Sequence, residues 1–203
     1  ISSIVDAATI MITAAATGTA SNVDVRIASP RTVNIGGAAR QLVFGTPDFS
    51  PTALVLGAES SNVPLTFVNP LKLGSVQRTF EVRGGGLTGP SGMAGQGLMK
   101  TGTGTLVISG TNAYEGDVVI AGGALRAMDV TSIPGGLGKE KGKGNIELRS
   151  GYLELGAGDM LRPLGSTRED FRITGSVAAG FSAVGGTRVV DFGEKGEATT
   201  VYF

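Results

Sequence analysis

The sequence has no histidine, no cysteine and no tryptophan, and only 5% of its 203 residues are aromatic. Without cysteine, disulfide frameworks, thiolate nucleophiles and cysteine-ligated zinc or iron–sulfur sites are excluded. Without histidine, the chain lacks the commonest general base and metal ligand, so Ser-His-Asp and Cys-His catalysis are excluded too. These absences remove the commonest catalytic and metal-binding chemistries from consideration.

Charge and hydropathy exclude further classes. Lys and Arg number 17 and Asp and Glu also number 17, so the chain lacks the basic footprint of a nucleic-acid binder and no nucleic-acid partner is expected. The longest weakly polar stretch, residues 4–20, is interrupted by Asp6, Gly18 and four threonines, so no transmembrane segment is expected. A hydrophobic content of 41% is nevertheless sufficient to build a core.

Glycine supplies 34 residues, about 17% of the chain against a usual ~7%, and it has no three-residue period of the collagen type. Apolar and polar residues alternate with period two in 22–27, 79–83 and 145–149, which is typical of half-buried strands. Gly, Pro, Asn or Asp occupies most of the gaps between apolar runs. Further strands are expected at 9–13, 32–35, 41–44, 53–56, 65–68, 105–109, 117–121, 124–127, 151–155, 171–174, 188–192 and 199–203.

Helical periodicity is weak throughout. Only residues 157–164 are compatible with one short turn of helix, which Pro163 would interrupt. The chain is therefore expected to be all-β, with many short strands and little or no helix.

Residues 98–155 contain the clearest internal repeat. The segments 118–125 (VVIAGGAL) and 146–153 (IELRSGYL) align, each with an apolar strand, a small-residue corner and a second apolar strand. Their offset of 28 residues falls in the range typical of solenoids, in which each coil buries its inward face against its neighbours. The sequence thus predicts a β-solenoid with glycine-rich corners.

Residues 98–127 (LMKTGTGTLVISGTNAYEGDVVIAGGALRA) resemble the autotransporter-associated β-strand repeat, also called the passenger-associated transport repeat, of large bacterial surface proteins. Many small positions agree at fixed spacing. Near Ile173 and Tyr202 the sequence departs from the tryptophans expected in the segment that often follows this repeat. The positions that carry the resemblance are Lys100, Gly102, Gly104, Leu106, Asn112, Tyr114, Gly116, Gly122, Gly123 and Leu125, together with Thr105, Ser109 and Gly110.

The resemblance implies a right-handed parallel β-helix that is exported and extracellular, without assigned catalytic residues, so we expect no enzyme, no cofactor and no metal site. Residues 1–203 are interpreted as a single solenoid, with a less regular part at 1–97, including a Gly-rich loop at 84–97, and a repeat-bearing part at 98–203. The ten principal repeat residues are expected to have structural roles.

The chemistry of the individual residues indicates which structural role each has. Asn112 is expected in a corner, where its amide caps backbone groups or joins a ladder of stacked asparagines. Tyr114 is expected to cover that corner, and Gly102 and Gly104 to let the chain turn before Leu106 enters the core. Gly123 is expected to adopt a positive φ.

Two glycine-rich segments resemble nucleotide-binding loops only superficially. Residues 84–89 satisfy G-x-G-x-x-G after a strand, but the sequence that follows does not favour the helix that would hold a pyrophosphate. Residues 135–144 hold Lys139, Lys141 and Lys143 without a Walker pattern. The lysines are interpreted as a solvated turn, with contact to an anionic surface as the alternative.

Carboxylates that pair across coils would be needed for a carbohydrate-active enzyme. Glu147 and Glu154 are predicted on adjacent strands and both outward, with Arg126 and Arg149 nearby. A surface charge ladder that supports stacking is the favoured interpretation. The Asp residues are dispersed, so no calcium loop is expected.

Neither end of the sequence has a good cap, because 1–16 is apolar and β-prone and 199–203 reads as a strand. End-to-end self-association, or continuation in a longer chain, is therefore expected. The favoured function is a structural subunit or section of an extracellular bacterial fibre or surface coat. The alternative is an adhesin-type passenger module that contacts glycans or host surfaces through a β-face or a loop such as 84–97.

Overall fold

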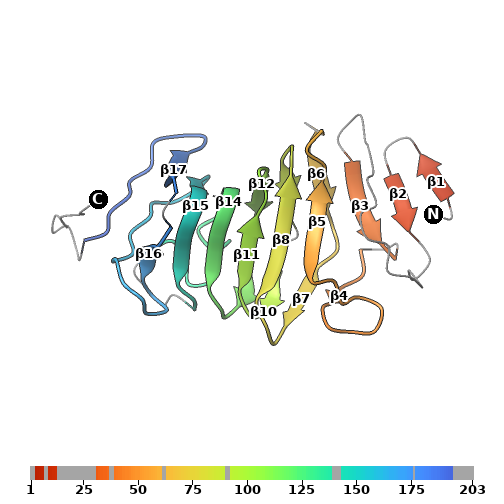
Figure 1. Ribbon diagram of the computed structural model, residues 1–203, viewed down its shortest axis with the longest axis horizontal. Coiled ribbons are helices and arrows are strands. Elements are labelled where there is room, and N and C mark those ends of the chain that lie inside the picture. Colours follow the sequence, from red (N-terminus) through yellow and green to blue (C-terminus); the bar gives the residue numbers. More distant parts are fainter. Residues whose placement is uncertain are drawn as a thin grey trace.

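The fold is a row of short β-strands that lie side by side along the long axis of the molecule (Figure 1). A computed structural model describes residues 3–6, 9–12, 31–36, 39–60, 63–89, 92–138, 143–175 and 177–193. Within these ranges there are strands, turns and bends but no helix, which confirms the all-β prediction. β1 and β2 pair antiparallel, and the other strand pairs in the described part are parallel.

The strands are short, except for two of ten residues. In chain order they are β1 (Ser3–Asp6), β2 (Thr9–Ile12), β3 (Arg31–Ile35), β4 (Leu42–Val43), β5 (Ala53–Gly57), β6 (Leu65–Phe67), β7 (Leu71–Gly74), β8 (Arg78–Arg83), β9 (Leu87–Thr88), β10 (Ala94–Gly95), β11 (Leu98–Thr101), β12 (Thr105–Ile108), β13 (Ala113–Tyr114), β14 (Val118–Ala127), β15 (Ile146–Leu155), β16 (Phe171–Ile173) and β17 (Ala179–Ala183).

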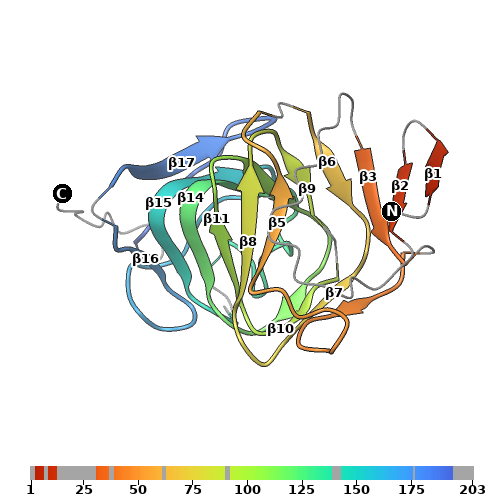
Figure 2. The same ribbon diagram turned by 45° about the vertical axis from the view of Figure 1, so that its right-hand side comes forward.

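Parallel pairing arranges these strands in three ladders. The front ladder contains β5, β8, β11, the first halves of β14 and β15, and β16. The back ladder contains β2, β3, β6, β9, β12, the second halves of β14 and β15, and β17, with β1 added antiparallel to β2. The lower ladder contains β4, β7, β10 and β13. Figure 2 shows β7 and β10 below β8 and β11, with β6 and β9 behind them.

The chain visits the three ladders in turn, and we call the stretch between one strand and its next parallel partner in a ladder a coil. Arg78 is in register with Leu98, and Leu98 with Val118, so coils here are 20 residues long. Between Val118 and Ile146 the coil lengthens to 28 residues. That register confirms the sequence alignment of 118–125 with 146–153. β14 and β15 each run through a corner, so the two strands predicted in each of these segments are joined.

The core consists of apolar columns, because equivalent positions of successive coils point inward. In the back ladder Leu106, Leu125 and Leu153 are in register and almost fully buried. In the front ladder Phe80, Ile120 and Leu148 occupy one column, with Lys100 between the first two. Each coil therefore buries its inward side chains against both neighbours, and the hydrophobic effect acts along the whole stack.

Some predicted elements were wrong. Residues 188–192 form no strand and make only an isolated bridge from Val190 to Met160. Residues 157–164 form no helix, because Met160 and Leu164 bridge to neighbouring coils instead. The interval 84–97, predicted as a loop, contains β9 and β10. Predicted strands 22–27 and 199–203 lie outside the described residues.

The sequence analysis also missed β7, β11, β13 and β17: β13 has only two residues and β17 is rich in small residues, whereas β7 and β11 alternate over only four residues each. Two-residue strands such as β10 and β13 form only because a neighbouring coil supplies hydrogen-bonding partners. The β8–β11 pairing runs across residue 97, so the front ladder continues from the first part of the chain into the repeat-bearing part.

The glycine corners are explained by close approach of the backbones of successive coils. Gly123 has a φ of 59°. A Cβ built on it would lie 2.5 Å from the carbonyl oxygen of Gly102 and would also collide with that of Gly104. A Cβ on Gly104 would in turn lie 2.6 Å from the oxygen of Gly84. Any side chain here would push neighbouring coils apart, so the corner needs glycine at successive levels.

We expect Gly123→Val to destabilise the fold by about 2–4 kcal/mol, because it combines a strained positive φ with a backbone collision. Gly185→Val is the matched control, since Gly185 also has a positive φ of 77° but nothing lies within 4 Å of its Cβ position. The free energies of unfolding in urea of the two variants are compared, and their difference gives the cost of the backbone collision apart from that of the strained φ. Equal losses of stability would show that the corner collision does not matter.

Candidate functional site

Lys100 is the most unusual of the repeat residues because it is a fully buried cation. It lies in β11 in register with Phe80 and Ile120, and its side chain enters the core column at the level of a corner. Its Nζ donates hydrogen bonds to the carbonyl oxygens of Thr101 (2.7 Å), Gly102 (3.0 Å) and Gly122 (3.0 Å). The ammonium thus joins the corner of its own coil to that of the next coil.

The protonation of Lys100 reflects this position. Burial lowers the pKa of the amine to about 8, although the negative charge of Glu81 partly opposes the shift. Three carbonyl dipoles use the three donors of an ammonium group, so no donor remains for a substrate. The geometry therefore gives Lys100 a role in the corner rather than in chemistry.

Asn112 bridges three levels of the stack. Its Oδ1 accepts a hydrogen bond from the amide of Met93 (2.9 Å), and its Nδ2 donates to the carbonyl oxygen of Ser132 (2.8 Å). The structure therefore places Asn112 in a corner, where it binds main-chain groups instead of stacking on other asparagines. Two levels earlier, Asn69 binds both the amide and the carbonyl of Ile35, and its Nδ2 also donates to Oδ1 of Asn34 at 3.4 Å.

Tyr114 follows in β13 and is also buried. Its ring fills the interior of the corner, and its hydroxyl has no hydrogen-bond partner in the part of the chain that the structure describes. Burial raises the pKa of this phenol well above its ordinary value, while the positive charge of Arg162 acts in the opposite direction.

Arg162 is a second fully buried cation, and sequence reasoning missed it. Its guanidinium donates to the carbonyl oxygens of Gly136 (2.5 and 3.1 Å), Gly144 (2.9 Å), Arg168 (3.4 Å) and Pro134 (3.5 Å). Burial lowers its pKa to about 10. Arg162 thus binds the backbone of the extra residues, within 128–145, that lengthen the preceding coil to 28 residues. In the sequence, the polar loop at 135–144 is the only indication that such a group is needed.

The lysine cluster of the loop at 135–144 is only partly described. Lys139 and Lys141 lie outside the described residues. Lys143 is exposed, and its Nζ lies 3.8 Å from Glu115, so this lysine forms a weak surface ion pair.

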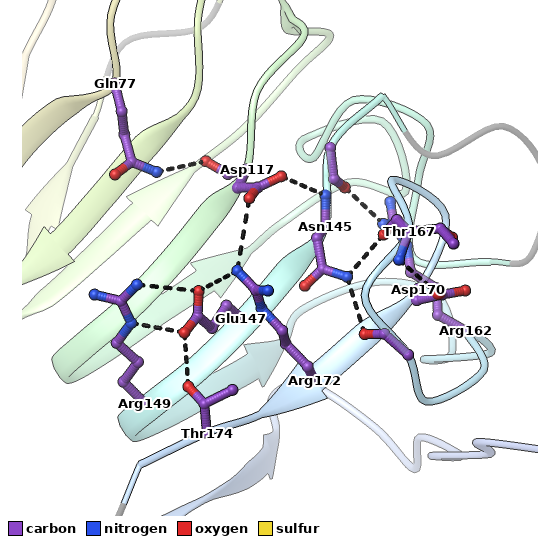
Figure 3. Close-up of polar contacts among 12 residues, drawn as sticks. Gln77, Asp117, Asn145, Glu147, Arg149, Arg162, Thr167, Asp170, Arg172 and Thr174 are labelled. Atoms are coloured by element: carbon purple, nitrogen blue, oxygen red, sulfur yellow. Dashed lines mark hydrogen bonds and ion pairs between the residues drawn. The ribbon is translucent and has the colours of Figure 1, made fainter.

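The densest group of charges lies on the outward face of the front ladder, around Glu147 (Figure 3). The Glu147 carboxylate accepts hydrogen bonds from Arg149 (2.7 and 3.2 Å), from Arg172 on β16 (2.6 Å) and from the hydroxyl of Thr174 (2.6 Å). These partners cover the carboxylate, and only 5% of its side chain is exposed. Arg172 also lies 3.7 Å from Asp117, whose other oxygen accepts from the amide of Asn145.

These contacts determine what Glu147 can do. Hydrogen bonds from Arg149, with further ones from Thr174 and Arg172, lower its pKa to about 2 against the opposing effect of burial. A carboxyl group that stays ionised at neutral pH cannot act as a general acid, and both of its oxygens are already engaged.

The predicted arrangement of Glu147 and Glu154 needs correction. They lie in one bent strand, β15, rather than on adjacent strands, and they bind different arginines. Glu154 binds Arg126 of β14 at 2.7 Å, which is a contact between coils, as a charge ladder requires. In the part of the chain that the structure describes, no three acidic residues are grouped so as to hold a metal ion.

The G-x-G-x-x-G segment at 84–89 contains β9, and the described residues from 92 onward lead into β10 rather than into a helix. Its backbone is used for stacking, as the collision between a Cβ on Gly104 and the oxygen of Gly84 shows. This geometry is unlike that of a dinucleotide-binding loop, which needs a helix N-terminus.

Comparison with known families assigns the central part of the chain. The family model of the passenger-associated-transport-repeat matches residues 98–127. The chain carries this repeat. No curated protein and no solved structure matches the chain. None of the described segments forms a helix long and apolar enough to cross a membrane. The repeat associates the chain with autotransporter passengers, which are secreted or surface-related proteins.

The passenger-associated-transport-repeat comprises β11, β12, β13 and β14, so it begins and ends in strands that pair with each other. Its lysine binds the carbonyls of two of its own glycines, Gly102 and Gly122. Leu106 and Leu125 are buried in register within it. The remaining motif glycines stack on neighbouring coils: a Cβ on Gly116 would collide with Gly97, and one on Gly122 would lie 3.2 Å from the oxygen of Gly102.

Glu147 should make stability depend on acid pH. Because its pKa is lowered from 4.5 to about 2, its contribution is complete above about pH 5 and is lost as the pH falls towards 2. We expect Glu147→Gln to cost up to about 3 kcal/mol at pH 7 and much less near pH 2.5. Urea unfolding at both pH values measures this, with Glu154→Gln as the control. A pH-independent difference from wild type would contradict the role of the cluster.

Lys100 should make stability rise with pH in the alkaline range. Between its folded pKa of about 8 and its ordinary pKa of 10.5, the unfolded chain binds more protons, so raising the pH favours folding. We expect the stability of wild type relative to Lys100→Met to rise by roughly 1–3 kcal/mol between about pH 7.5 and pH 10. Lys72→Met, at an exposed position in β7, is the control. If the difference in stability between wild type and Lys100→Met stayed constant over this range, the lowered pKa of Lys100 would be wrong.

Proposed function

We propose that this chain is a structural section of a bacterial surface protein, built as a right-handed parallel β-helix and without catalytic activity. The observation that carries the proposal is the arrangement of the repeat. Its strands pair with each other and with both neighbouring coils in parallel register, and its polar residues bind main-chain groups. Such a repeat supplies a rigid rod rather than a reaction centre.

The unusual polar groups support a structural role. Lys100 and Arg162 are saturated with carbonyl oxygens, and Glu147 is saturated with donors. A general base, a nucleophile or an anion site would need one of these groups to face a ligand. Each of them instead joins neighbouring coils, which stabilises the stack.

The edges of the ladders support assembly along the stack. In the described part β17 pairs only with β15, so its outer edge offers hydrogen-bonding groups to a further coil. The outer edge of β16 is partly covered, because the main chain of Phe171 bonds to Pro163 and Gly165. Phe171, Phe181 and Phe192 close the core at this end, with ring centroids 5.4–5.8 Å apart. We propose that the next coil is supplied either by continuation of the same polypeptide or by end-to-end contact with a second copy, which would extend the rod into a fibre or a coat.

Immunogold electron microscopy of intact cells of the source bacterium tests this proposal. An antibody raised against the purified chain should label fibres or a continuous layer outside the cell, and a strain lacking the gene should show no label. Label that appears only inside opened cells would contradict the surface assignment. Surface label on separate particles would contradict the fibre or coat.

A further inference from the structure

We draw no further inference here: the strongest candidate, the group of exposed apolar side chains at the β16–β17 end of the rod (Leu164, Ile173, Val177 and Val189), carries nothing because nothing in the structure shows what covers it.

Discussion

The need to satisfy main-chain polar groups at the corners governs this structure. Strand backbones pair along the three ladders, but the chain must leave one ladder and enter the next at a point where water is excluded. Lys100, Asn112 and Arg162 satisfy the groups left over at these points, and each of them is buried. An unpaired buried carbonyl or amide costs about 1–3 kcal/mol, so several such corners would exceed the net stability of an ordinary domain.

The same corners account for the glycine content. Glycine at 102, 104 and 123 brings the backbones of successive coils close enough for one ammonium group to reach carbonyls on two levels. A larger residue would separate the coils and leave the lysine without its second partner. Glycine and lysine in the passenger-associated-transport-repeat therefore act together: the glycines allow the close approach of the coils, and the lysine bonds to carbonyls on both.

Alternation and turn residues were sufficient to predict the all-β class and most long strands, because β8, β12, β14 and β15 each bury one face. They could not reveal β10 or β13, which depend on partners in other coils, nor the bend that makes 118–127 a single strand. The repeat identified Lys100, Asn112 and Tyr114 as important, but Arg162 carries no local signal. Its role depends on the 128–145 excursion, which lies in a preceding coil. Glu147 was expected on the surface, and its burial follows from Arg172 on a separate strand.

The polar side chains of the corners have a limited reach along the sequence. Lys100 contacts a residue 22 positions away, Asn112 one 20 positions away and Arg162 ones 18 to 28 positions away. These corner residues therefore couple each level of the stack to its immediate neighbours. The free energy of unfolding of such a molecule grows roughly in proportion to the number of coils. A destabilising substitution in one coil therefore weakens mainly the adjacent coils. Evolution can consequently lengthen or shorten the rod by whole coils while the remainder keeps its structure.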